Sequence, residues 1–126
     1  MSDVWIVFLG GGAGSVARFL VGAWMARALG LSFPWGTFAV NVAGSFLLGG
    51  VMYLGATTQA LSPNVRLALA TGFCGGFTTY STFNHEVFWL AKDGAWGTAA
   101  AYVLGTVATC LAAGAAGWVL AAKASG

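Results

Sequence analysis

The chain has 126 residues, of which 59% are hydrophobic and 6% are charged, with a formal net charge of +2. Soluble domains carry about 25% charged residues, so this composition excludes an ordinary soluble domain and indicates an integral membrane protein. The five basic residues form no cluster, which argues against nucleic-acid binding. A spanning helix uses roughly 20 apolar residues, so the length leaves room for about four helices in one domain.

The apolar runs predict an all-α membrane domain of four transmembrane helices. The first run lacks the basic start of a signal peptide, so we expect it to be retained. Polar or Gly/Pro-containing turns separate the runs, and all six tryptophans lie near a predicted membrane boundary. The expected spans are residues 4–26, 37–56, 66–91 and 96–121.

The basic residues near the span ends divide equally between the two sides of the membrane. Arg27 and Lys92 fall on one side, and Arg66 and Lys123 fall on the other. Orientation normally follows an excess of Lys and Arg on the cytoplasmic side, so two against two gives almost no preference. Copies of the chain can then insert in both directions, which makes an antiparallel homodimer physically plausible.

Small residues recur at helical spacing in the first two spans. Such stripes let helix backbones approach closely, either between two subunits or within one. We expect at least one stripe to form a subunit interface, with internal packing as the alternative. The stripes are Gly10, Gly14, Gly22 and Ala26 in the first span, and Thr37, Asn41, Ser45 and Gly49 in the second.

The third span carries a glycine- and hydroxyl-rich stretch at residues 72–79. As a straight helix, residues 66–91 would measure about 39 Å, which exceeds the thickness of the hydrocarbon core. The paired glycines and threonines therefore predict an interruption at mid-membrane. Carbonyl groups freed there suit a small hard cation, and a simple glycine kink is an equally good interpretation.

A polar run with two aromatic rings follows at residues 80–86. Lipid would not tolerate this density of polar groups. Hydroxyl and amide donors can replace the hydration of a small anion, and the ring edges of Tyr80 and Phe83 carry partial positive charge. Ordinary helix packing, with the hydroxyls bonded back to the backbone, is the alternative.

Charged and polar side chains elsewhere in the spans have two interpretations each. Arg18 either lines a vestibule that gathers anions or extends to the lipid headgroups. Glu86 is paired, protonated or part of a gate, and with His85 it lacks the nucleophile or metal set of an enzyme. Thr106 belongs to a partial polar face on the fourth span, where bonding to its own backbone is the commoner arrangement.

Three blocks of the chain resemble the Fluc, or CrcB, family of small fluoride channels, and the likeness runs nearly end to end: Gly11–Phe19, Gly36–Asn41 and Thr71–Phe83. This resemblance implies an antiparallel, dual-topology homodimer in the inner or plasma membrane, with several membrane passes per chain. It also implies two passive fluoride pathways along the subunit interface, which protect the cell against fluoride toxicity. One structural sodium ion would be held by the backbone carbonyls of Gly75 and Thr78.

The resemblance also assigns roles to individual residues. Asn41 and the ring edges of Tyr80 and Phe83 would line each pathway, with Ser81 and Thr82 among the hydroxyls near it. Weaker vestibule candidates are Arg18, Glu86, Thr106 and Cys110. The chain departs from the family at four positions: Tyr80 stands where Phe is usual, Asn84 where Ser is usual, and Cys110 and Gly114 where Ser or Thr is usual.

Two other functions compete with the channel. A proton-coupled exporter of the small multidrug type needs a carboxylate in its first helix, and residues 4–26 contain none. A non-conducting scaffold subunit would explain the small-residue stripes but not the polar run after Gly76. Pairing with a paralogous chain instead of a second copy stays open.

Overall fold

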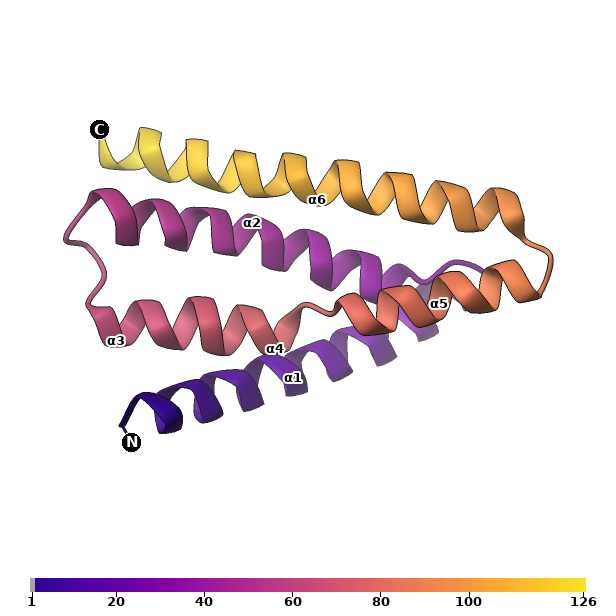
Figure 1. Ribbon diagram of the computed structural model, residues 1–126, viewed down its shortest axis with the longest axis horizontal. Helices are drawn as coiled ribbons and strands as arrows, with labels where there is room; N and C mark the ends of the chain where they lie inside the picture. Colours follow the sequence, from indigo (N-terminus) through magenta and orange to yellow (C-terminus); the bar gives the residue numbers. More distant parts are fainter. Residues whose placement is uncertain (1) are drawn as a thin grey trace.

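The computed structural model describes residues 2–126, which cross the length of the molecule four times as helices (Figure 1). The first two passes are α1 (Ser2–Leu29) and α2 (Trp35–Thr57). The third pass is made of α3 (Pro63–Arg66), the π-helical stretch η1 (Leu67–Cys74), α4 (Gly75–Phe77) and α5 (Tyr80–Lys92). The fourth is α6 (Trp96–Ser125). The described chain is therefore all-helical, as the sequence predicted.

The helix ends follow from local sequence. Gly30 and Gly94 end α1 and α5 with φ angles of +80° and +78°, a left-handed conformation that glycine adopts without steric cost. Ser62 caps α3, because its Oγ accepts a hydrogen bond from the Val65 N–H at 3.2 Å, and Pro63 occupies the first turn. The connections are consequently short, and the four passes lie antiparallel in sequence order.

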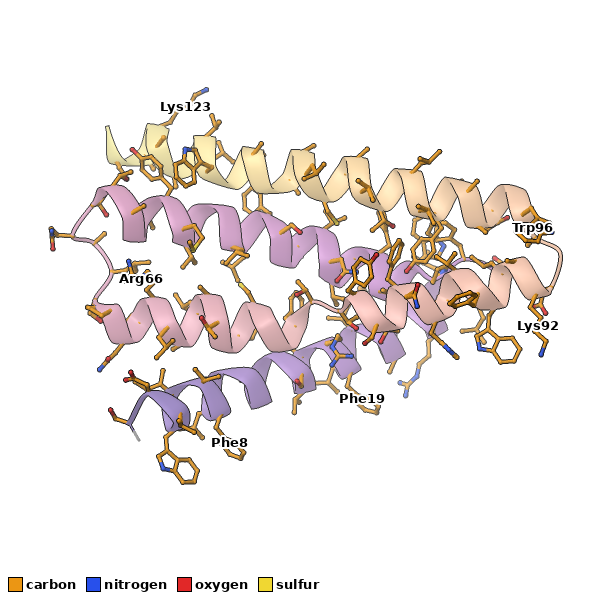
Figure 2. All side chains as sticks on the ribbon, in the orientation of Figure 1. Phe8, Phe19, Arg66, Lys92, Trp96 and Lys123 are labelled. Atoms are coloured by element: carbon orange, nitrogen blue, oxygen red, sulfur yellow. The ribbon has the colours of Figure 1, made fainter. Side chains whose placement is uncertain are left out.

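The four passes bring α1's start and α6's end to the same end of the bundle (Figure 1). Lys92 and Trp96 lie at the opposite end from Arg66 and Lys123 (Figure 2). Arg27 is in the last turn of α1, which leads toward the Lys92 end. Two basic residues thus lie toward each end, as counted in the sequence.

The outer surface is apolar. Phe8 and Phe19 point away from the other helices (Figure 2), and like most large apolar side chains they are exposed. Among the described residues, α1, α2 and α6 are each long and apolar enough to cross a membrane. Water would not tolerate such a surface, so the fold is that of a membrane protein.

Close backbone contacts hold the bundle together, chiefly between α2 and α6 and between α1 and the η1–α4 stretch. Gly14 of α1 lies against the Phe73 carbonyl, and Gly49 of α2 lies against the Gly114 carbonyl. A side chain at either glycine would overlap these backbone atoms. Both glycines belong to the stripes noted in the sequence, and both pack inside one chain. Internal packing, the alternative given for the stripes, therefore accounts for these two positions.

Gly14 offers a direct test of this packing. Gly14→Leu must push α1 away from Phe73, so we expect it to lower the free energy of unfolding by about 1–3 kcal/mol. Gly12→Leu is the matched control, because no atom of another element lies within 4 Å of a side chain added there. Thermal unfolding in detergent, followed by circular dichroism, measures both. Equal stability of the two variants would contradict the proposed contact.

Candidate functional site

The third pass is interrupted at Thr78 and Thr79, near the middle of the bundle (Figure 1). Both residues are extended, with φ and ψ of −88° and 159° at Thr78 and of −153° and 118° at Thr79. They lie within the stretch at residues 72–79 where the sequence predicted an interruption. Extended residues between two helical pieces leave backbone groups without their usual partners, so other parts of the chain must supply them.

Asn41 of α2 supplies partners for Thr79. Its Nδ2 donates to the Thr79 carbonyl at 3.1 Å, and its Oδ1 accepts from the Thr79 N–H at 2.7 Å. One side-chain amide thus binds both backbone groups of Thr79, including the N–H that has lost its helical partner. Asn41 therefore fixes the position of the interruption as well as facing the space beside it.

Arg18 and Thr79 hold the two helix ends that flank the interruption. The Arg18 Nε donates to the Gly76 carbonyl at 3.0 Å, at the end of α4. The Thr79 Oγ1 accepts from the Thr82 N–H at 3.2 Å, which caps the start of α5. Arg18 also lines a cavity of about 450 Å³ with Thr82. Its partner is thus a backbone carbonyl inside the bundle, which contradicts an arginine that merely reaches the headgroups.

Several carbonyl groups at the interruption have lost their helical partners, among them those of Gly75, Phe77 and Thr78. In a continuous helix the Gly75 carbonyl would accept from the Thr79 N–H, which here donates to Asn41. The Thr78 carbonyl would accept from the Thr82 N–H, which here donates to the Thr79 hydroxyl. Within residues 2–126, neither carbonyl accepts a hydrogen bond from another residue. Both oxygens are available to a ligand.

A groove of about 350 Å³ lies between α2, the start of α5 and α6. It brings together six of the candidate site residues that the sequence singled out: Asn41, Thr78, Tyr80, Phe83, Thr106 and Cys110. The Tyr80 and Phe83 rings meet edge to face, with centroids 5.8 Å apart. Of the other two pathway candidates, Ser81 is exposed and Thr82 lines the Arg18 cavity instead.

The Thr106 hydroxyl stands out in this groove, because it is buried and, among the described residues, has no hydrogen-bond partner. Other threonines, such as Thr57 and Thr78, do bond back to a carbonyl four residues earlier. That arrangement, which was the alternative for Thr106, is therefore wrong. A buried hydroxyl left unpaired costs about 1–3 kcal/mol, which makes Thr106 an exception among the threonines of the described chain.

Glu86 accepts two hydrogen bonds from neutral donors. Its Oε2 accepts from the Thr37 hydroxyl at 3.0 Å, and its Oε1 accepts from the Tyr102 hydroxyl at 2.8 Å. Tyr102 is fully buried and packs on Phe83, with ring centroids 5.0 Å apart. Both carboxylate oxygens therefore act as acceptors. Glu86 is thus paired with hydroxyl groups, one of the three possibilities that its position left open.

Glu86 also lies at the wall of a second cavity, of about 300 Å³, near the connection between α1 and α2. The Phe83–Tyr102 contact links the groove to Glu86, since Phe83 lines the groove and Tyr102 binds Glu86. Sequence reasoning missed Thr37 and Tyr102 as parts of the site. The available signal was spacing: Thr37 belongs to the small-residue stripe of the second span, and Tyr102 lies four residues before Thr106 on the polar face of the fourth. This spacing did not identify Glu86 as their partner.

These features define a class of protein: a small helical membrane protein with an interrupted segment and, beside it, a mostly apolar groove that a few polar side chains line. Residues 5–118 match the family described as CrcB-like protein, Camphor Resistance (CrcB). The chain is 52% identical over 113 residues to the fluoride-specific ion channel FluC of Anaeromyxobacter dehalogenans, covering 90% of each chain. It is 48% identical over 115 residues to the protein of that name from Sorangium cellulosum, covering 91% of each.

A third relative with the same name, from Geobacter sulfurreducens, is 44% identical over 111 residues, or 88% of this chain and 90% of the relative. The chain therefore belongs to the CrcB family, and the resemblance noted in the sequence is confirmed. It is not an enzyme, since the family and its curated members are ion channels.

Hydrogen exchange tests the role of Asn41. We expect Asn41→Ala to speed exchange of the Thr79 amide, because the lost bond leaves that amide unpaired at a cost of about 1–3 kcal/mol. Asn41→Asp keeps an acceptor for the same N–H and should retain more protection. Ser45→Ala, at the same groove and on the same helix, is the control. Equal protection in Asn41→Ala and Ser45→Ala would exclude this role.

Proposed function

We propose that this chain is a fluoride-selective passive channel that exports fluoride from the cytoplasm. The groove between α2, α5 and α6 carries the proposal, because the Asn41 amide, the Thr106 hydroxyl and two aromatic rings line one space. Relatives about half identical to the chain are named fluoride-specific ion channels, which supports the same ion here. The proposed setting is the inner or plasma membrane, with all four passes spanning it as one domain.

The chemistry of the groove suits a small anion. Hydroxyl and amide donors, together with the positive edges of Tyr80 and Phe83, replace water around fluoride without a full positive charge. The nearby Arg18 already donates to the Gly76 carbonyl, and Glu86 is held by two hydroxyl groups. An ion in the groove therefore meets weak, repeated contacts from which it can leave, as conduction requires.

A passive pathway is sufficient for export. Fluoride enters an acidified cell as the neutral acid, dissociates in the cytoplasm and is retained by its charge. The negative-inside membrane potential contributes about 2.3 kcal/mol per 100 mV toward outward movement of the anion. Such a channel lowers cytoplasmic fluoride without ATP or a coupled ion, and so protects the cell against fluoride.

An antiparallel homodimer would complete two such pathways, one beside each groove. Tyr80 is 80% exposed in the single chain, so one ring of the groove needs a covering surface. The basic residues balance between the two ends, which permits both orientations.

With Ser125→Cys in a Cys74→Ala, Cys110→Ser background, a membrane-impermeant thiol label should reach equal fractions of the protein from each side of the membrane. Labelling from one side alone would refute dual topology.

The free carbonyls of Gly75 and Thr78 fit a structural sodium ion. Sodium is a hard cation, and backbone carbonyl oxygens without other partners are suitable ligands for it. Two carbonyls from each copy would meet at the centre of the proposed dimer. A bound ion would balance the partial negative charge of these oxygens and would link the interrupted third passes of the two copies. It would not be transported.

Sodium should therefore stabilise the protein. At about a hundred times its Kd, a ligand that binds only the folded state adds about 2.7 kcal/mol. We expect the melting temperature in sodium to exceed that in N-methylglucamine at the same ionic strength, with potassium as the control for a small cation. An identical melting temperature in sodium and N-methylglucamine would exclude the ion site without affecting the fluoride groove.

Fluoride efflux from liposomes tests the channel itself. With a potassium ionophore to carry the balancing charge, we expect rapid fluoride loss and no chloride loss. Phe83→Ile removes a ring edge from the groove and should slow efflux about tenfold or more. Phe88→Ile is the matched control, since Phe88 is on the same helix and 67% exposed. No fluoride loss in sodium-containing buffer would reject the channel and favour the scaffold function.

A further inference from the structure

Phe33, an aromatic residue outside the groove, belongs to the same set of ring contacts as Phe83. It lies in the short connection between α1 and α2 and does not line the groove. Its ring meets the buried Tyr102 ring at an interplanar angle of 77°, with centroids 5.2 Å apart. Tyr102 meets Phe83 at 64° and 5.0 Å, and Phe83 meets Tyr80 in the groove. These four rings form an aromatic row from the connection to the groove: Phe33, Tyr102, Phe83 and Tyr80.

The backbone holds Phe33 at the outer end of this aromatic row. The Phe33 carbonyl accepts from the Trp35 N–H at 2.8 Å across Pro34, whose φ and ψ are −79° and 68°. These values are close to those of an inverse γ-turn, and the proline ring itself restricts φ. The Trp35 ring lies against the Phe33 ring, with centroids 4.5 Å apart. The turn and this packing therefore limit the positions open to the Phe33 ring.

The plane of the Tyr102 ring depends on its aromatic neighbours. The Tyr102 hydroxyl donates to the Glu86 Oε1 at 2.8 Å, which fixes the tip of the side chain. A ring held at its tip can still turn about its own long axis, and edge-to-face packing opposes that turn. Phe33 and Phe83 each supply such a contact. Loss of the Phe33 ring would leave space beside a side chain that is now 0% exposed, and the neighbouring rings would relax into it.

We propose that Phe33 is a positioning residue for the fluoride pathway: it holds the Tyr102 ring, which in turn holds the Phe83 ring in its place at the groove. The inference rests on the fluoride channel proposed above, in which the Phe83 ring edge contacts the ion. A displaced ring makes a poorer contact with fluoride. Loss of the Phe33 ring should therefore slow efflux, although Phe33 does not line the groove.

Fluoride efflux from liposomes tests the positioning role. We expect Phe33→Leu, which removes the ring, to slow efflux about two- to tenfold, and Phe33→Tyr, which keeps the ring, to retain the wild-type rate. Phe38→Leu is the matched control and should also retain it. Phe38 contacts Phe33, but it does not line the groove and forms no ring pair with Tyr102 among the described side chains. Phe33→Ile is a second variant, and gel filtration shows that each protein is folded.

Fluorine NMR gives a readout that does not depend on transport. With para-fluorophenylalanine at position 83, the chemical shift reports the surroundings of that ring. We expect Phe33→Leu to move or broaden the signal, and Phe33→Tyr and Phe38→Leu to leave it in place. An unchanged signal in folded Phe33→Leu and Phe33→Ile, or an equal change in Phe38→Leu, would overturn the assignment.

The two measurements separate this inference from the proposed function. If wild type carries no fluoride, the channel proposal fails, and the NMR signal alone decides whether Phe33 positions the ring at residue 83. If wild type conducts and folded Phe33→Leu conducts at the same rate, Phe33 has no role in the pathway, and the inference is refuted while the channel stands.

Discussion

The structure depends on one constraint: a membrane-spanning segment cannot leave its backbone polar groups unpaired. The extended residues Thr78 and Thr79 break the helical pattern where no bulk water is available. Asn41 pairs both backbone groups of Thr79, and Arg18 pairs the Gly76 carbonyl. The carbonyls of Gly75, Phe77 and Thr78 accept no hydrogen bond from another of residues 2–126. The interruption is thus held by side chains of two other elements, α1 and α2.

This arrangement positions everything around the groove. Because α5 begins anew at Tyr80, its rings face α2 and α6 at the level of the interruption. Phe83 then packs on Tyr102, whose hydroxyl binds Glu86 together with that of Thr37. Close glycine contacts between α2 and α6 keep these side chains within reach. Backbone pairing, aromatic packing and the carboxylate form one connected set of contacts.

The same contacts show how charged groups lie near the proposed anion pathway. Arg18 donates its Nε–H to the Gly76 carbonyl and lines a separate cavity rather than the groove, and Glu86 accepts from two hydroxyl groups. What remains in the groove is mostly neutral: an amide, hydroxyls, ring edges and a thiol. In the proposed pathway, neutral donors bind an ion weakly enough to release it. At Cys110 this chain has a thiol where the family usually has the hydroxyl group of Ser or Thr.

The sequence by itself determined the membrane class, the helical passes, the balanced charges and the family, because these depend on composition, on local spacing and on long matching blocks. It also pointed to residues 72–79, since glycine and hydroxyl chemistry is local. Only the tertiary structure decided that Asn41 meets Thr79, 38 residues away, and that Arg18 meets Gly76, 58 residues away. It likewise left Thr106 unpaired. Helical periodicity relates residues within one helix, whereas these partners are chosen by how separate helices pack.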